Sequence, residues 1–194
     1  MNTVKKFEFT GETKRYLGVT LNQIRALRDF GNIKAGDLGG WIERENQLDH
    51  LENAWVFEDA WVFEDARVFG DAWVSGNAWV SGNARVSGNA RVVGNAWVYG
   101  NARVYGDARV VGDARVAGNS DLICVGPIGS EKGTLAAYRD KTLGLRVTRG
   151  CFSGSLDEFR AAVIERHGDN RHAQAYSAAI TFIESFFVID GSKP

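Results

Sequence analysis

The sequence predicts a mainly β fold: a single-stranded parallel β-helix with an N-terminal β cap and a small C-terminal α+β module. Three observations support this prediction. Valine recurs at every sixth position from Val56 to Val116, an alanine precedes each of these valines by two residues, and most phrases end in Gly-Asn or Gly-Asp. A period of six does not fit a helix of 3.6 residues per turn, but it suits short strands joined by tight turns.

Each six-residue phrase predicts one short strand and one corner. In Ala-Arg-Val-Ser, strand alternation places Ala and Val on one face and Arg and Ser on the other. Glycine accepts positive φ and Asn or Asp tolerates it, so each phrase ends in a corner. Three strands would form an 18-residue coil of triangular section, and the eleven valine phrases would form almost four coils. Parallel strands stacked at ~4.8 Å predict a rod about 20 Å long.

We expect three regions: an N-terminal hairpin and cap in residues 1–40, the hexapeptide-repeat β-helix in residues 41–123, and the α+β module in residues 124–194. A solenoid exposes strand edges and core at both ends, so both ends need caps. The segment KFEFTGETKRYLGVTL predicts a hairpin. An irregular first coil is expected through Ile42, Leu48 and Leu51, with about two residues more than the strict spacing.

The repeat stops after Ser120 and the composition changes. The segments DLICVGPIG, TLAAYRDK and LRVTRGCFSG predict the strands of a small antiparallel meander. SLDEFRAAVIERHG predicts a helix, because Ser155 and Glu158 have capping-box spacing and Gly168 follows as a stop. Residues 171–187 predict a second helix, with Tyr176, Ile180, Ile183 and Phe187 on one apolar stripe. We expect the two helices to pack on the meander.

The whole-chain composition limits the class of protein. Lys plus Arg number 23 against 24 Asp plus Glu, so the net charge of -1 predicts neither a polyanion-binding tail nor a nucleic-acid mimic. Two cysteines in different contexts form no disulfide framework and fit a reducing cytoplasm. The N-terminus lacks a signal-peptide hydrophobic region and no run of ~18 apolar residues exists, so we expect a cytoplasmic protein without membrane contact.

The residue between the repeated Ala and Val is only ever Trp or Arg, and stacking residues 18 apart sorts it onto three faces. The tryptophan face carries Trp61, Trp79, Trp97 and Arg115, with Phe63, Ser81 and Tyr99 beside them. The mixed face carries Trp55, Trp73, Arg91 and Arg109. The arginine face carries Arg67, Arg85 and Arg103, with Phe69 and Tyr105 beside them, followed by Asp121.

The tryptophan strip is too large to leave exposed on a soluble monomer, so we expect it to be covered. The cover is either a sister rod, which would make a homo-oligomer (trimer or dimer), or the C-terminal helices. The predicted interface residues are Trp61, Phe63, Trp79, Trp97, Tyr99, Trp55 and Trp73.

The basic ladder of Arg67, Arg85 and Arg103 has suitable chemistry for a single nucleic-acid strand. However, the neutral overall charge gives little long-range attraction, so we expect a solvated ladder or oligomer rim and no nucleic acid. Corner aspartates such as Asp71, Asp107 and Asp113 are expected to pair with the repeat arginines.

No catalytic, cofactor-binding or metal-binding residue is predicted. There is no histidine between Asn53 and Gly118 to act as a general base. We expect His50 to have a surface or capping role, and His167 and His172 to lie in a solvated interhelical turn, because their spacing matches no strong zinc pattern. Cys124 and Cys151 are expected to be small buried apolar residues.

The V-x-G-N/D-A-x phrase is similar to the hexapeptide repeat of left-handed β-helix proteins, and that resemblance implies a left hand. The segments RDFGNIKAGDLGGWIERENQLDHLENAWVFEDA and GCFSGSLDEFRAAVIERHGDN resemble bacterial and prophage proteins labelled as transferases or polymer-forming proteins. Many left-handed β-helix proteins are coenzyme A-dependent acyltransferases with a His base and a loop extruded from the coils. This sequence departs from both features between residues 53 and 118.

We therefore predict a non-enzymatic, self-associating scaffold, encoded by a phage or prophage, that binds and modulates a host protein in the bacterial cytoplasm. The alternative is a coenzyme A-dependent acyltransferase of the hexapeptide-repeat type. That activity would require His50, His167 or His172 to reach an intersubunit cleft as the base.

Overall fold

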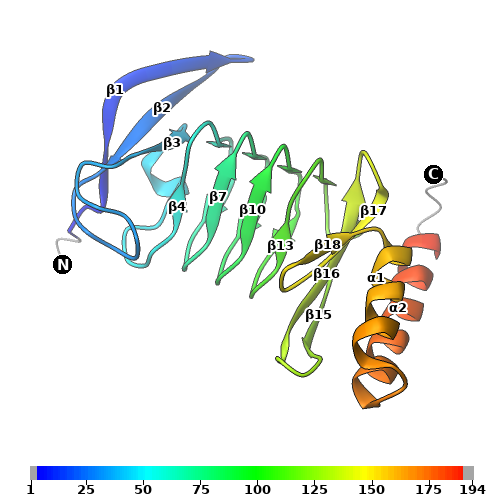
Figure 1. The fold of residues 1–194 in the computed structure, drawn as a ribbon. Coiled ribbons are helices and arrows are strands. Elements are labelled where there is room, and N and C mark those ends of the chain that lie inside the picture. The colour runs from blue at the N-terminus through cyan, green and yellow to red at the C-terminus, as the bar shows by residue number, and fades with distance from the viewer. Residues whose placement is uncertain (1–3, 190–194) are drawn as a thin grey trace.

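The central part of the chain is a β-solenoid of about four turns with parallel sheets, as the repeat predicts (Figure 1). The computed structural model describes residues 4–189. Strands on the tryptophan face are β5 (Trp61–Val62), β8 (Trp79–Val80), β11 (Trp97–Val98) and β14 (Arg115–Val116). The mixed face has β4 (Trp55–Val56), β7 (Trp73–Gly76), β10 (Arg91–Gly94) and β13 (Arg109–Val110). The arginine face has β6 (Arg67–Val68), β9 (Arg85–Val86) and β12 (Arg103–Val104).

The register confirms the 18-residue coil. Trp61 pairs with Trp79, and Trp79 with Trp97, in parallel strands. The repeated inward alanines and valines from Ala54 to Val116 are at most 1% exposed, so the interior of the rod is one continuous apolar core. The left hand implied by the resemblance stays a prediction.

Most corners carry a glycine with positive φ, and several of these glycines pack closely on the corner of the next coil. Gly82 has φ +66°, and a Cβ at this position would lie 2.7 Å from the backbone nitrogen of Gly100. In the early phrases Glu58 and Glu64 occupy this left-handed position instead, with φ 54° and 60°. Their carboxylates accept the backbone N–H groups of Gly76 and Gly82 in the next coil. These two glutamates therefore hydrogen-bond to the corresponding corner of the next coil.

The N-terminal hairpin extends the tryptophan-face sheet. Strands β1 (Phe7–Tyr16) and β2 (Val19–Ala26) form the hairpin, and β2 pairs with β3 (Leu38–Ile42), which runs parallel to β5. Trp41 in β3 pairs with Trp61, and Leu48 bridges to Val68, so both pairs are twenty residues apart rather than eighteen. The short helix η1 (Glu45–Gln47) belongs to this coil. The expected two extra residues are confirmed, but Leu51 is 73% exposed and is not part of the core.

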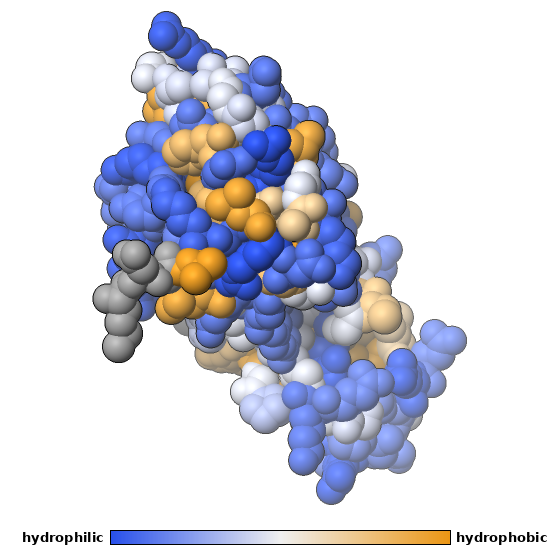
Figure 2. Space-filling view, turned by 90° about the vertical axis from the view of Figure 1, so that its left-hand side faces the viewer, coloured by the Kyte–Doolittle hydropathy of each residue, from blue (hydrophilic) through white to orange (hydrophobic). Residues whose placement is uncertain are grey.

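The first coil is closed by side chains from the hairpin and its following loop. Trp55 is fully buried, with Phe7 and Phe30 edge-on to its ring at 6.3 and 5.2 Å. Lys6 is also buried, and its Nζ donates to the carbonyl oxygens of Glu52 and Ala54 at 2.9 and 2.8 Å. Burial lowers the pKa of Lys6 to about 8. Figure 2 looks onto this end, where the surface is mostly hydrophilic and apolar atoms form small separate groups.

The C-terminal module closes the opposite end (Figure 1). Strands β15 (Leu122–Ile128), β16 (Gly133–Asp140), β17 (Gly144–Arg149) and β18 (Phe152–Gly154) form the expected antiparallel meander. The Tyr138 hydroxyl accepts the backbone N–H of Val111 at 2.8 Å, which ties the meander to the last coil. Helices α1 (Leu156–His167) and α2 (Arg171–Ile189) pack on the meander, and the Ser155–Glu158 capping box is confirmed. In residues 4–189, neither helix has the length and apolar character of a membrane span.

Candidate functional site

The outward tryptophans of the tryptophan face form a continuous stack. The ring centroids of Trp61 and Trp79 are 4.6 Å apart with an interplanar angle of 6°, and those of Trp79 and Trp97 are 4.9 Å apart at 1°. Parallel strands in register repeat the same side chain every ~4.8 Å, which is why the rings stack face to face. The Arg115 guanidinium ends the column 4.4 Å above the Trp97 ring, a cation–π contact.

The chain's own hairpin covers the N-terminal part of this column. The Tyr16 ring lies edge-on to Trp61 at 5.2 Å and to Trp79 at 4.9 Å. Leu21 of β2 is buried in the same cluster as Trp41 and Phe63. The helices were one of the two covers expected for this face, and that alternative is wrong: their apolar residues form a separate cluster with the meander. The N-terminal hairpin covers the column instead, and an additional sister rod stays a prediction.

An aromatic groove remains open at the end of the covered region. It has a volume of about 370 Å³ and is lined by Tyr16, Leu17, Phe63, Trp79, Ser81, Trp97, Tyr99 and Arg115. The side chains of Trp97 and Tyr99 are 38% and 39% exposed, and Leu17 at the hairpin turn is 86% exposed. Four predicted interface residues therefore meet here, whereas Trp61 lies under Tyr16. The sequence reasoning missed Tyr16 and Leu17, although an apolar leucine in the turn Tyr-Leu-Gly was a usable signal.

The two tryptophans of the mixed face have different environments. Trp55 was predicted as an interface residue, and that prediction is wrong because the N-terminal cap buries it completely. Trp73 is half-buried, with the Phe57 ring 5.2 Å from its own and the Arg91 guanidinium 4.8 Å over its ring. The mixed face therefore offers less open aromatic surface than the aromatic groove.

The arginine face presents Arg67, Arg85 and Arg103 in register and exposed to solvent. A groove of about 590 Å³ lies between this face and the C-terminal module, lined by Phe69, Arg85, Ser87, Arg103, Tyr105, Asn119, Leu122, Ile123, Cys124 and Phe186. Cys124 is half-buried, and burial raises the pKa of its thiol to about 11, so it is not a reactive thiolate.

The corner aspartates pair with asparagines rather than with the repeat arginines. Asp71, Asp107 and Asp113 each accept a side-chain N–H from the asparagine 18 residues earlier: Asn53 at 2.7 Å, Asn89 at 2.9 Å and Asn95 at 3.2 Å. The expected aspartate–arginine pairs are therefore wrong. The corners hold one coil to the next instead of neutralising the faces.

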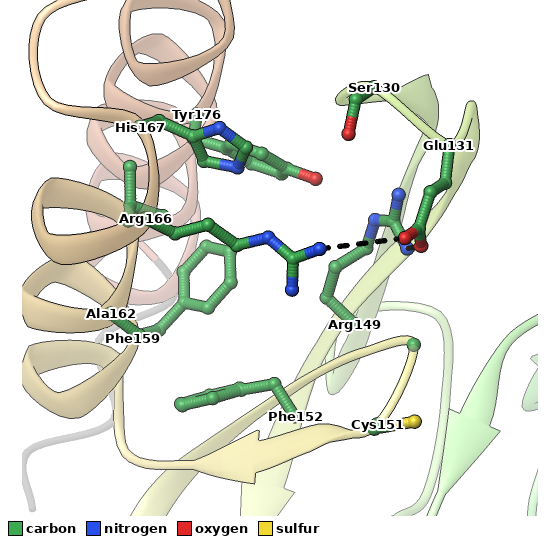
Figure 3. Close-up of a pocket in the computed structure, with 12 residues that line it drawn as sticks. Ser130, Glu131, Arg149, Cys151, Phe152, Phe159, Ala162, Arg166, His167 and Tyr176 are labelled. Carbon is green, nitrogen blue, oxygen red and sulfur yellow. Dashed lines mark ion pairs between the residues drawn. The ribbon is translucent and has the colours of Figure 1, made fainter.

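A third pocket, of about 240 Å³, lies between the meander and the helices (Figure 3). Arg149 and Arg166 both point toward Glu131, with N–O distances of 3.8 and 3.7 Å. Cys151 is exposed, so its predicted burial is wrong, and its sulfur points away from His167 at the other end of the pocket (Figure 3). Nucleophilic catalysis needs the thiol and its base within hydrogen-bond reach, which this arrangement does not provide.

The histidines take structural positions. The His50 ring stacks on Phe7 at 4.5 Å, its Nδ1 accepts the backbone N–H of Lys6 at 3.0 Å, and its Nε2 lies 3.0 Å from Glu45. His167 and His172 lie 5.8 Å apart between centroids where α1 meets α2. Among residues 4–189 there is no group of three or more His, Cys, Asp or Glu side chains that could hold a metal ion.

Comparison with known proteins gives matches in the repeat. Residues 66–82, 84–100, 96–112 and 102–118 match a family model described as YdcK Beta solenoid repeat. A stretch of 40 residues is 45% identical to the "Uncharacterized acetyltransferase YdcK" of Escherichia coli (strain K12), and it covers 21% of this chain and 12% of that relative. With the observed coils, these matches show that the chain is a β-solenoid repeat protein.

Proposed function

We propose that the protein is a non-enzymatic scaffold that associates with a second copy of itself through the aromatic groove. The observation that carries this proposal is the open end of the tryptophan stack. Trp97 and Tyr99 remain more than a third exposed beside Trp79, which the hairpin partly covers. Clustered aromatic side chains bury much apolar area and dominate the energetics of protein interfaces.

A second copy suits this surface because one molecule presents both an exposed apolar side chain and an aromatic groove. The protruding Leu17 side chain and the groove beside Trp97 lie on the same face of the molecule. In a two-fold dimer each copy presents the same patch, so Leu17 of each copy can fill the groove of the other. Such an exchange would bury the apolar side chains that the hairpin leaves exposed.

The replacement Trp97→Arg tests self-association directly. Arginine occurs naturally in the same repeat slot, for example at Arg91 and Arg115, so the coil should fold unchanged. We expect the wild-type protein to be a dimer by light scattering after gel filtration, and both Trp97→Arg and Leu17→Asp to be monomers. Trp73→Arg makes the same change on the mixed face and should leave the dimer intact. A wild-type protein that is monomeric at 100 micromolar would refute the proposal.

The partner of such a scaffold is expected to be a host protein. The resemblance of the segments around residues 28–60 and 150–170 to prophage proteins supports a protein that a phage or prophage encodes and that acts in the bacterial cytoplasm. Affinity capture from host lysate tests this expectation, with an unrelated solenoid as the comparison bait. Recovery of no protein above the level of an unrelated solenoid would count against a host partner.

A coenzyme A-dependent acyltransferase is the second candidate, because the relative with the matching stretch is named an acetyltransferase. Such an enzyme needs a general base near the acceptor. His50 is held between Phe7, the Lys6 N–H and Glu45, and His167 and His172 belong to the C-terminal module rather than to the coils. Calorimetric titration with acetyl-coenzyme A distinguishes the two: saturable micromolar binding would favour the enzyme, and its absence the scaffold.

A further inference from the structure

The six arginines of the Trp-or-Arg slot divide into two groups by their contacts. The Arg91 guanidinium lies 4.8 Å over the Trp73 ring, that of Arg115 lies 4.4 Å over Trp97, and Arg109 donates to the carbonyl of Gly150 at 2.6 Å. The other three lie on the arginine face, and their guanidinium groups have no ion pair, hydrogen bond or ring contact with any residue in the described range 4–189: Arg67, Arg85 and Arg103. Arginine in this repeat position therefore has a ring or carbonyl contact for its guanidinium group on two faces, and no such contact on the third.

The acidic side chains that line a pocket with Arg67 and Arg85 form hydrogen bonds or ion pairs with other groups. Asp65 pairs with Arg44 at 3.2 Å, and the Glu64 carboxylate accepts the backbone N–H of Gly82. At the other end of the face, Asp121 accepts the backbone N–H groups of Ala117 and Gly118 at 2.8 and 3.2 Å. Like charges directly opposite each other on neighbouring strands are destabilising. The ladder is therefore a stack of three guanidinium groups in register, none of which forms an ion pair with a residue of the described range.

Apolar side chains lie beside the charges. Phe69 and Tyr105 are 37% and 55% exposed, and Phe186 of α2 lines the same groove with Arg85 and Arg103. A small anion would use the charges and leave these rings exposed. An occupant that satisfies both must carry acidic and apolar groups on one surface.

The axial spacing of the arginines can be compared with the axial repeat of an α-helix, an extended strand and a nucleic-acid strand. Neighbouring rungs are ~4.8 Å apart, so Arg67 and Arg103 are about 9.6 Å apart along the solenoid axis. An α-helix along this axis repeats one face every ~5.4 Å and drifts by about 1.2 Å over two steps. An extended strand repeats a face every ~6.7 Å and drifts by about 4 Å. Phosphates of a stacked strand, ~3.4 Å apart along the strand axis, fall short by about 3 Å over two steps.

We propose that the arginine face binds an acidic, amphipathic α-helix of a partner protein, lying along the solenoid axis with one acidic side chain per turn against each rung. Its flanking apolar side chains contact Phe69, Tyr105 and Phe186. This inference extends the scaffold function to a partner class, but it uses a different surface from the aromatic groove.

The test uses a fluorescein-labelled 14-residue helical peptide with glutamates on one face over three successive turns and Leu and Phe flanking them. A control peptide has the same composition with the glutamates spread around the helix. We expect saturable binding of the first peptide by fluorescence anisotropy, at least tenfold weaker binding of the second, and loss of affinity between 50 and 300 mM salt. The double replacement Arg85→Gln and Arg103→Gln should weaken binding at least tenfold.

Arg91→Gln is the matched control, because it removes the same side chain from the same repeat slot on another face. We expect its affinity for the peptide to stay within twofold of wild type. Equal binding of both peptides, an equal loss in Arg91→Gln, or no saturable binding by 1 mM would overturn the proposal. Tighter binding of a 15-nucleotide oligo-dT that depends on Arg85 and Arg103 would also overturn it and assign the surface to nucleic acid. Peptide affinity is measured on both wild type and Trp97→Arg. Equal affinity in the two proteins would show that peptide binding does not depend on self-association.

Discussion

Replacement of Tyr16 by alanine tests whether the N-terminal hairpin is held by the tryptophan column. The Tyr16 ring lies 5.2 Å from Trp61, 6.2 Å from Phe63 and 4.9 Å from Trp79, all in edge-on geometry. Each aromatic pair of this kind contributes about 0.5–1.5 kcal/mol beyond its buried area. Truncation of a fully buried aromatic residue costs about 3–5 kcal/mol, and Tyr16 is half-buried. We therefore expect Tyr16→Ala to lower the free energy of unfolding by about 2–3 kcal/mol.

Urea unfolding followed by tryptophan fluorescence measures this loss, because Trp61 and Trp79 themselves report the contact. Near-UV circular dichroism at zero urea should also weaken as the stacked rings lose their cover. Tyr105→Ala is the matched control: Tyr105 is 55% exposed on the arginine face, so its removal should cost less than about 0.5 kcal/mol. An unchanged unfolding midpoint in Tyr16→Ala, or equal losses in both variants, would show that the hairpin is not anchored by this ring.

Two further predictions concern the corners and the N-terminal cap. Gly82→Ala should destabilise the protein by at least about 1 kcal/mol more than Gly106→Ala, measured by thermal unfolding. Both glycines have positive φ, but an added Cβ would lie 2.7 Å from a backbone atom at Gly82 and would meet nothing within 4 Å at Gly106. Equal losses of stability in the two variants would contradict the stacking argument. Burial lowers the pKa of Lys6 to about 8, so from there to the unfolded value of ~10.4 the unfolded chain holds one proton more, and stability should rise with pH in that window. The urea midpoint should be higher at pH 9.5 than at pH 7 in wild type but not in Lys6→Met. The same change of midpoint in both proteins would show that Lys6 does not cause the rise.

The solenoid could be predicted because its information is local and repeated. Each inward Ala and Val occupies the same environment in every coil, so eighteen-residue register follows from the period, and the pairing of Trp61 with Trp79 and Trp97 confirms it. The capping box at Ser155 is likewise local, since both of its hydrogen bonds join residues three apart. Periodicity and local spacing therefore carry these elements without knowledge of the tertiary structure.

Exposure on the outward faces could not be predicted in the same way. Trp55 and Trp73 occupy identical repeat positions, but Trp55 lies in the first coil, where Phe7 and Phe30 from the cap bury it. The hairpin was predicted, but its position over Trp61 depends on the pairing of β2 with β3 and of β3 with β5. These are contacts between distant segments, and no pattern within the hairpin encodes them. The repeat therefore assigns each residue to a face but does not determine what covers that face.

The Trp-or-Arg slot illustrates how one scaffold carries different surfaces. Where the slot is not covered by the N-terminal cap, as at Trp97, both side chains project outward from a backbone whose core residues, Ala and Val, do not change. The sheet then repeats whatever occupies the slot every ~4.8 Å. For tryptophan this distance permits ring stacking, and the column stabilises itself. For arginine it places like charges side by side, and Arg91, Arg109 and Arg115 each contact an aromatic ring or a carbonyl oxygen. On the arginine face the guanidinium groups make neither contact with the described residues, and the acidic helix proposed above would supply the opposite charge.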